Sequence, residues 1–221
     1  MNIVIFGAGC FAELLSYYIL QNKTNKILAF TVDNSCLCSN TLQRGGKKIV
    51  PFEEIEKNFK TTEVSIIPAV GYSKMQLRSK IFEKIKAKGY KIPNIVCKGA
   101  ILDSSVEIGE GNIIMPGTIV EPFVKIGNNN IFWSGSHICH DAIIEGHSFF
   151  AAESVVGGRT KVGESTFIGF NTTVIHDLQI GANNVIGAGS FVNKSTEPNS
   201  KYYGVPAKKK ETMPPEGWSI K

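Results

Sequence analysis

The chain has few of the features that would place it in an oxidising compartment or in a membrane. Its five cysteines are scattered and odd in number, and no two of them form a C-x-x-C pair. Neither a disulfide framework nor a structural zinc module is therefore indicated, and reduced thiols are the simplest interpretation. The start MNIVIFGAG lacks the basic residues and long apolar stretch of a signal peptide, and no run of about 18 apolar residues can span a bilayer. We expect a cytoplasmic protein without a membrane partner.

Charge of one sign is not concentrated either. The net charge is +5, but the lysines are dispersed apart from the run Lys208, Lys209 and Lys210. A nucleic-acid-binding domain more often has a basic stripe with interleaved aromatic residues, so we expect no nucleic-acid partner. A local basic site for a small phosphorylated ligand fits the pattern better. At 221 residues and 43% hydrophobic content, the chain is long enough to bury a core in one or two domains.

The first part of the chain alternates strand-like and helix-like segments. Short β-rich runs at 2–6, 26–32 and 64–70 alternate with helical patterns at 11–20, 51–59 and 73–88. The order strand, turn, helix, strand is typical of a small parallel α/β unit. We expect a Rossmann-like βαβαβ domain over residues 1–92.

The second part has a period of six residues. Every sixth position from Val96 is apolar: Val96, Leu102, Ile108, Ile114, Val120, Ile126, Phe132, Ile138, Ile144, Phe150, Val156, Val162, Ile168, Val174, Ile180, Ile186 and Val192. At this composition, chance gives such a series about once in a million registers. Most positions two residues earlier are small, and neither an α-helix nor an ordinary strand has this period.

This pattern resembles the hexapeptide repeat of left-handed parallel β-helices, in which three hexads make one triangular coil. The resemblance implies between five and six coils, stacked about 4.8 Å apart. We expect the β-helix to form a domain over residues 93–196, with a C-terminal tail over 197–221. The N-terminal domain would cap one end and the segment after Val192 the other.

The combination of the two parts resembles a narrower family. KYYGVPAKKK (201–210) looks like the tail common in hexapeptide acyltransferases, and EPFVKIGNN (121–129) followed by WSGSHICHD (133–141) is the most specific part of the likeness. With the N-terminal βαβ unit, the chain is similar to nucleotide-sugar acyltransferases of the bacillosamine, perosamine and sialic acid O-acetyltransferase type. The resemblance implies a homotrimer, acetyl-CoA as the acyl donor, a nucleotide-linked amino sugar as the acceptor, and a place in surface-glycan biosynthesis such as that of O-antigen.

The chemistry requires a base with a pKa near neutrality, since a protonated amine cannot attack a thioester. His140 lies two residues beyond the interior Ile138, and Asp141 follows it. The resemblance places the catalytic histidine at His140, with an acidic neighbour that Asp141 can match. His137 either faces the same cleft, as a substrate-binding residue, or only caps a corner. We expect structural or exposed roles for His147 and His176.

The resemblance also implies where the acyl donor binds. Its pantetheine arm would contact the backbone near Gly158, Phe170, Gly187 and Ala188. Lys208, at the start of the lysine run, can meet the donor's phosphates, because clustered ammonium groups suit a multiply charged ligand. The alternative for this run is a solvated tail.

In the N-terminal part, GAGC (7–10) opens a helix, and a glycine turn at a helix N-terminus is an anion site. A full G-x-G-x-x-G is missing because position 12 is alanine, which disfavours a dinucleotide cofactor. In the family that the chain resembles, this turn holds the diphosphate of the nucleotide sugar. That implies substrate binding by Gly7, Gly9 and Cys10, with Asp33 near the base. A purely structural turn is the alternative. Arg78 either helps with phosphate or lies on a helix surface.

Three other functions stay open. A zinc enzyme of the carbonic-anhydrase type needs three histidine ligands, but the spacing of His137 and His140 does not fit that family, and we expect no metal. A nucleotide-sugar-binding trimer without catalysis, or O-acylation of a sugar hydroxyl, would use the same scaffold. The sequence does not distinguish UDP, dTDP and GDP sugars, the position of the amine, or acetyl from longer acyl donors.

Overall fold

The computed structural model of the protein describes residues 1–37, 43–214 and 217–220, and it divides into two compact units. The N-terminal unit comprises Met1–Gly71 and Lys80–Pro93, and the C-terminal unit comprises Tyr72–Ser79 and Asn94–Lys221. The main break, after Pro93, lies one residue from the expected boundary. The division differs from the expected one in two ways, since residues 72–79 belong to the C-terminal unit and residues 197–221 are not set apart as a tail.

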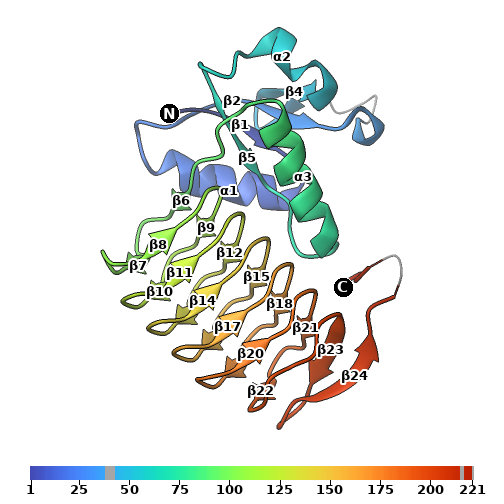
Figure 1. Ribbon diagram of the computed structural model, residues 1–221. Helices are drawn as coiled ribbons and strands as arrows, with labels where there is room; N and C mark the ends of the chain where they lie inside the picture. The colour runs from blue at the N-terminus through green and yellow to red at the C-terminus, as the bar shows by residue number, and fades with distance from the viewer. Residues whose placement is uncertain (38–42, 215–216, 221) are drawn as a thin grey trace. The chain divides into compact units, whose positions relative to one another are not determined.

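The N-terminal unit is an α/β unit around one sheet with the strand order β3-β4-β2-β1-β5 (Figure 1). All neighbours are parallel except β3 and β4. The strands are β1 Asn2–Phe6, β2 Lys26–Val32, β3 Gln43–Arg44, β4 Lys47–Pro51 and β5 Ser65–Pro68. The helices are α1 Cys10–Leu20, η1 Asn34–Cys36, η2 Phe52–Glu54, α2 Ile55–Asn58 and α3 Met75–Ala87, of which residues 75–79 belong to the C-terminal unit.

Burial in the core of this unit explains why the sequence predicts β1 but not β4. Ile3, Val4 and Ile5 of β1 have no exposed surface, as expected for a continuous apolar run in a parallel sheet covered on both faces. Burying side chains of this size contributes about 1.5–3 kcal/mol each. The sequence patterns do not predict β4, because only Ile49 and Val50 are apolar between two lysines and a proline. Both are buried, and β4 forms by pairing with β2.

The C-terminal unit contains the solenoid that the six-residue period predicts. Residues 95–192, all of them described, form seventeen strands of two residues each, β6 to β22. Their bounds are β6 Ile95–Val96, β7 Ile101–Leu102, β8 Glu107–Ile108, β9 Ile113–Ile114, β10 Ile119–Val120, β11 Lys125–Ile126, β12 Ile131–Phe132, β13 His137–Ile138, β14 Ile143–Ile144, β15 Phe149–Phe150, β16 Val155–Val156, β17 Lys161–Val162, β18 Phe167–Ile168, β19 Thr173–Val174, β20 Gln179–Ile180, β21 Val185–Ile186 and β22 Phe191–Val192.

These strands stack into three sheets of parallel strands, and each residue pairs with the residue one coil later (Figure 1). Ile119 pairs with His137, and His137 pairs with Val155, so that neighbours across coils are 18 residues apart. Three hexads therefore make one coil, and successive coils lie about 4.8 Å apart. This register determines which outward-facing side chains are neighbours on adjacent coils.

The predicted apolar positions fill the interior of the β-helix. Ile138, Phe150 and Ile168 have no exposed surface, and the rings of Phe132 and Phe150 stack with centroids 4.7 Å apart. The first position departs from the pattern, since Val96 is 51% exposed. The strand that carries it, β6, lies at the end of its sheet and has a neighbouring strand on one side only.

The small polar residues two positions earlier are buried and form ladders between coils. Asn112 and Asn130 have no exposed surface. The backbone N–H of Asn130 donates to Asn112 Oδ1 at 2.8 Å, and its amide nitrogen donates to the carbonyl oxygen of Glu145 at 3.0 Å. These bonds satisfy polar groups that would otherwise be costly to bury.

The glycines that follow the apolar positions allow close packing between coils. A Cβ at Gly127 would lie 2.6 Å from the carbonyl oxygen of Glu145 in the next coil. Turn residues with positive φ lie three residues after an interior apolar position. They include Asp141 (φ 59°), after Ile138, and His147 (φ 63°), after Ile144. The glycine excess thus reflects steric contact between coils as well as turns.

The segment after Val192 covers the last coil, as expected. β23 Ser200–Tyr203 pairs with β21 and extends its sheet, and β24 Lys208–Thr212 pairs with β23. Beyond β24, the chain returns to residues 72–79 of the same unit. The backbone N–H of Ile220 donates to the carbonyl oxygen of Ser73 at 3.0 Å.

Arg78 holds residues 72–79 against the β-helix through hydrogen bonds with Asn129. It is 1% exposed, its Nη2 donates to the carbonyl oxygen of Asn129 at 2.5 Å, and Asn129 Nδ2 donates back to the Arg78 carbonyl at 3.1 Å. Burial lowers the pKa of the guanidinium to about 9, so it stays charged at neutral pH. The interpretation of Arg78 as a helix-surface residue is therefore wrong. Asn129 also contacts His147 Nδ1 at 3.0 Å, which gives that histidine a structural role.

Candidate active site

His140 and Asp141 lie together at a turn directly after β13. His140 Nδ1 is 2.8 Å from Asp141 Oδ2, and both side chains are about half exposed. The positive φ of Asp141 belongs to this turn, where the two adjacent side chains meet. A carboxylate on Nδ1 favours the tautomer with its proton on Nδ1, which leaves the Nε2 lone pair available as a base.

Glu121, which the sequence patterns do not identify, connects His140 to His137. One of its carboxylate oxygens accepts the backbone N–H of His140 at 2.8 Å, and the other lies 2.7 Å from His137 Nε2. Burial acts to raise the pKa of Glu121, but the hydrogen bonds from His140 and His137 outweigh it and lower the pKa. The 18-residue coil period is the signal that locates Glu121, because it places position 121 beside Cys139.

An open pocket of about 520 Å³ lies in front of these residues. Glu121, Cys139, His140, Gly157 and Gly158 all line it. Gly158 lies against the imidazole, since a Cβ there would be 2.8 Å from His140 Nε2. The structure therefore brings Gly158, expected at the acyl donor, next to the expected base. His176, at the rim, is exposed as expected.

Phe170, Gly187 and Ala188, the other expected donor-binding residues, share a second pocket of about 410 Å³. Tyr72 and Trp218 also line it, and Trp218 Nε1 donates to the carbonyl oxygen of Asn183 at 2.6 Å. No pattern in the sequence identifies these two aromatic residues. Lys208 does not line this pocket and is exposed on β24, whereas Lys201 does line it.

In the N-terminal unit, the GAGC turn joins β1 to α1. Gly7 has φ 119°, and a Cβ there would lie 2.8 Å from the carbonyl oxygen of Ala69, so the turn requires glycine at this position. Gly9 is the N-cap of α1 and has no side-chain cap. The first N–H groups of a helix lack partners within the helix, which suits an anion. Gly9 and Cys10 are both exposed there.

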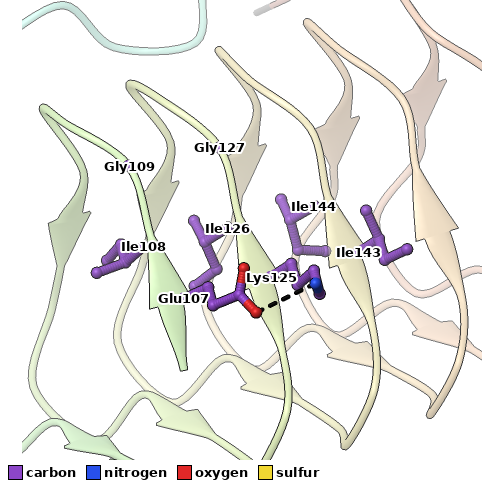
Figure 2. Close-up of a pocket in the computed structure, with 8 residues that line it drawn as sticks. All are labelled: Glu107, Ile108, Gly109, Lys125, Ile126, Gly127, Ile143 and Ile144. Carbon is purple, nitrogen blue, oxygen red and sulfur yellow. Dashed lines mark ion pairs between the residues drawn. The ribbon is translucent and has the colours of Figure 1, made fainter. Parts of the chain in front are cut away.

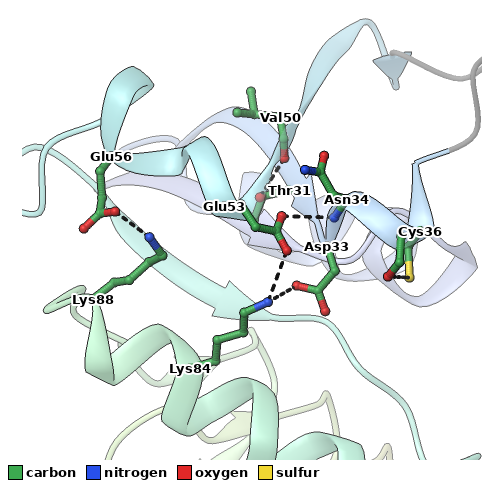
Figure 3. A network of polar contacts seen from close by, with 10 residues as sticks. Thr31, Asp33, Asn34, Cys36, Val50, Glu53, Glu56, Lys84 and Lys88 are labelled. Carbon is green, nitrogen blue, oxygen red and sulfur yellow. Dashed lines mark hydrogen bonds and ion pairs between the residues drawn. The ribbon is translucent and has the colours of Figure 1, made fainter.

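Asp33, at the end of β2, belongs to a polar network shown in Figure 3. Lys84 of α3 forms ion pairs with Asp33 and, at 3.6 Å, with Glu53. Burial acts to lower the pKa of Lys84, but the two carboxylates outweigh it and raise the pKa. Glu53 also accepts the backbone N–H of Asn34 at 3.0 Å. The expected substrate residue Asp33 is thus held in a defined position by neighbouring charges.

Among the described residues, one group of side chains has donor atoms close enough to hold a metal ion. It consists of Glu121, His137 and Cys139, whose nearest donor atoms all lie within 4.8 Å of one another. We expected no metal from the sequence. Within the same residues, no helix has the length and apolar content that a membrane span needs.

Comparison with known families gives one match for each unit. Residues 2–85 match the PglD N-terminal domain family, and residues 105–139 and 159–194 match the bacterial transferase hexapeptide family. The chain joins a PglD N-terminal domain to a bacterial transferase hexapeptide domain. The predicted family and the predicted α/β domain followed by a left-handed β-helix are confirmed.

Solved structures share this two-domain fold along almost their whole length. Perosamine N-acetyltransferase from Caulobacter crescentus, a histidine-to-asparagine mutant with CoA and GDP-perosamine, is 24% identical, with 96% of this chain and 97% of that chain covered and a TM-score of 0.86. The acetyltransferase domain of PglB from Neisseria gonorrhoeae FA1090, in complex with acetyl coenzyme A, is 20% identical, with 94% and 98% covered and a TM-score of 0.83. WeeI from Acinetobacter baumannii AYE is 19% identical, with 95% and 100% covered and a TM-score of 0.78.

The hexapeptide domain holds most of the expected chemistry. It carries His137, His140 and Asp141, and it carries all of the expected donor-binding residues. The PglD-type domain carries Gly7, Gly9, Cys10 and Asp33. Apart from Lys208, which stands alone on β24, the expected residues form one group at the β13 turn, one in the pocket beside Trp218 and one at the carboxyl ends of β1 and β2.

Proposed function

We propose that the protein transfers an acetyl group from acetyl-CoA to the amine of a nucleotide-linked amino sugar, with His140 as the general base. The single observation that carries the proposal is the His140 imidazole, oriented by Asp141 at 2.8 Å beside an open pocket. The same fold in acetyltransferases crystallised with acetyl coenzyme A or with CoA and GDP-perosamine supports it.

The reaction is a direct transfer. The sugar nitrogen attacks the thioester carbonyl carbon while His140 Nε2 accepts a proton from the nitrogen. The tetrahedral intermediate then collapses, the carbon–sulfur bond breaks, and the CoA thiolate leaves and is protonated. General base catalysis of this kind contributes about 10²–10⁴-fold to the rate. Asp141 accepts from Nδ1 throughout and stabilises the imidazolium that forms.

Glu121 and His137 support the base. Glu121 fixes the backbone of the His140 turn, and His137 holds the second oxygen of the same carboxylate. Because all three lie on two adjacent coils, the rigid β-helix positions them before substrate arrives. We assign His137 to the wall of the acceptor site on this basis.

Two pockets of the hexapeptide domain suit the acyl donor. Gly158 places its backbone at His140, where the thioester has to lie. Phe170, Gly187 and Ala188, with Trp218, form an apolar passage suited to the pantetheine arm. Lys208 is available for the donor's phosphates because it is exposed on β24.

The exposed N-terminus of α1 is the proposed place for the acceptor's diphosphate. Gly9 leaves open space in front of the first helical N–H groups, since a Cβ there would meet nothing within 4 Å. Gly7 sets the turn, Cys10 contributes the first N–H of the helix, and Asp33 contributes a carboxylate for a donor on the nucleoside.

We also propose a homotrimer, with one face of the β-helix at the subunit interface. A shallow groove on β8, β11 and β14, drawn in Figure 2, has Glu107, Lys125 and Ile143 on its outer side, whereas Ile126 and Ile144 beneath it are buried. Ile143 is 42% exposed, and the ion pair between Lys125 and Glu107 at 3.1 Å borders the groove. Exposed apolar side chains that stand beside charged ones are typical of protein contacts. Exposed Ile101 and Phe123 add to the exposed apolar surface of the β-helix.

A panel of UDP-, dTDP- and GDP-linked amino sugars, each incubated with acetyl-CoA, tests the proposal. The expected result is release of free CoA thiol and an acetylated amine with at least one acceptor. His140→Asn should lower kcat by about 10²-fold or more while CoA binding by calorimetry and thermal stability are retained. If no amino sugar releases CoA, the assignment fails. Acetylation of a hydroxyl would establish O-acylation instead, and sugar binding without turnover would establish a binding protein.

A further inference from the structure

We infer that Glu121, His137 and Cys139 form a binding site for Zn²⁺ at the edge of the His140 pocket. The site arises from the register of the coils. His137 and Cys139 lie on the outer side of the chain, because Ile138 between them points into the core with no exposed surface. Ile119 pairs with His137, so continuing the register by two residues places Glu121 beside Cys139.

The three donor atoms are close enough for one ion. They lie within 4.8 Å of one another, and His137 Nε2 and Glu121 Oε1 are already 2.7 Å apart. In a tetrahedral site, zinc lies about 2.0–2.3 Å from nitrogen, oxygen and sulfur ligands, so small rotations of the side chains would bring all three to it. All three residues are partly exposed, which leaves a path for the ion from solvent.

The types of donor select the class of metal. One thiolate, one imidazole and one carboxylate suit Zn²⁺ or Co²⁺, whereas Ca²⁺ and Mg²⁺ prefer oxygen ligands alone. Binding replaces the thiol proton of Cys139, which passes to solvent, so no oxidant or reductant is needed. Cys139 and Glu121 both line the His140 pocket, so a fourth ligand can reach the ion from that side.

Occupancy by a metal would change the surroundings of His140. Coordination takes Glu121 and His137 out of the hydrogen bond that joins them and places a dication next to the pocket. We therefore expect Zn²⁺ to act as a reversible inhibitor. This consequence rests on the proposed acetyl transfer, whereas the binding of metal does not.

Cobalt spectroscopy tests the site directly. The reduced full-length protein, freed of metal with a chelator, is titrated with Co²⁺. The expected result is a saturable thiolate-to-cobalt band in the near ultraviolet with tetrahedral visible bands, all removed by added Zn²⁺. Cys139→Ser should abolish the near-ultraviolet band, and His137→Asn should weaken Co²⁺ and Zn²⁺ binding by at least about 10-fold. The control Cys36→Ser, which changes an exposed thiol of the N-terminal unit, should leave both unchanged.

Each other outcome overturns the inference. No saturable cobalt spectrum from the wild-type protein, an unchanged thiolate band in Cys139→Ser, or loss of the band in Cys36→Ser would each rule out the site. A second experiment adds Zn²⁺ to the acetyl-transfer assay, where we expect inhibition that a chelator reverses. A cobalt spectrum without any acetyl transfer would refute the proposed function and leave the metal site standing.

Discussion

One carboxylate oxygen of Glu121 accepts the backbone N–H of His140 at 2.8 Å, across two neighbouring coils. This hydrogen bond fixes the turn that carries the proposed base. It is charge-assisted, so it should be stronger than a neutral hydrogen bond. Its removal is therefore a test of how far the position of the imidazole controls the rate.

Glu121→Ala should lower kcat about 10- to 100-fold with little change in KM for acetyl-CoA, because a base displaced by about 1 Å can lose as much as 10²-fold. Glu121→Gln keeps an oxygen that can accept the His140 N–H and should recover part of the loss. Steady-state kinetics measure both. Equal losses in the two variants would show that the carboxylate acts through its charge and not through this hydrogen bond.

Asp141→Asn should lower kcat by only about fivefold, because a half-exposed ion pair contributes at most about 1 kcal/mol and asparagine keeps an oxygen that can accept from Nδ1. The matched control is Asp177→Asn. Asp177 occupies the same kind of positive-φ turn two coils later and pairs with Arg159 instead of a catalytic group. A loss of similar size in both variants would exclude a specific role for Asp141.

Gly158→Ala should reduce acetyl transfer by up to about 100-fold while the protein stays folded. The new Cβ would lie 2.8 Å from His140 Nε2 and displace the imidazole or cover its reactive nitrogen. Gly71→Ala is the control, since a Cβ there meets nothing within 4 Å. Activity of Gly158→Ala at the wild-type level would show that the imidazole works in another orientation.

Arg78→Met should lower the free energy of unfolding by about 1–3 kcal/mol, because the buried carbonyl oxygen of Asn129 loses its donor. Urea denaturation measures the change. Lys74→Met, an exposed neighbour, should change stability by less than about 0.5 kcal/mol. Equal stability of the two variants would mean that residues 72–79 are held without Arg78.

Gly7→Ala should destabilise the N-terminal unit by at least about 1–2 kcal/mol, because alanine is strained at φ 119° and its Cβ would press on the carbonyl oxygen of Ala69. A Cβ at Gly9 meets no atom within 4 Å, so Gly9→Ala should keep the thermal midpoint. It should raise KM for the nucleotide sugar, because the methyl group would occupy the space proposed for the diphosphate. Thermal unfolding and kinetics separate the two effects. A normal KM in Gly9→Ala would argue against a diphosphate at this turn.

The β-helix could be predicted from the sequence because its interior repeats at a fixed interval. One apolar side chain every six residues has to point inward, so positions such as Ile138 and Phe150 identify themselves. β4 could not be predicted, because it forms through pairing with β2, and a two-residue apolar run carries no period. Arg78 shows the same limit, since its partner Asn129 lies 51 residues away.

The candidate site was predicted only in part for a related reason. His140 and Asp141 are adjacent in the chain, so a local motif identifies them. Glu121 and Trp218 reach their places through stacking of coils and return of the C-terminus, neither of which leaves a local pattern. Asp33 was expected from its place after a strand, but its ion pair with Lys84 depends on where α3 lies in the N-terminal unit.

Because each coil of the β-helix has 18 residues, the distance along it between His140 and the pocket beside Trp218 can be changed by whole coils. Inserting or deleting one whole coil between Val162 and Val192 would move the Trp218 end relative to His140 by about 4.8 Å. The strand register of the other coils would be kept, but Ile220 would move away from Ser73. A shorter insertion would break the ladder of paired strands. The number of coils would thus set the length of the acyl donor that fits, so donor selection could be engineered by adding or removing coils.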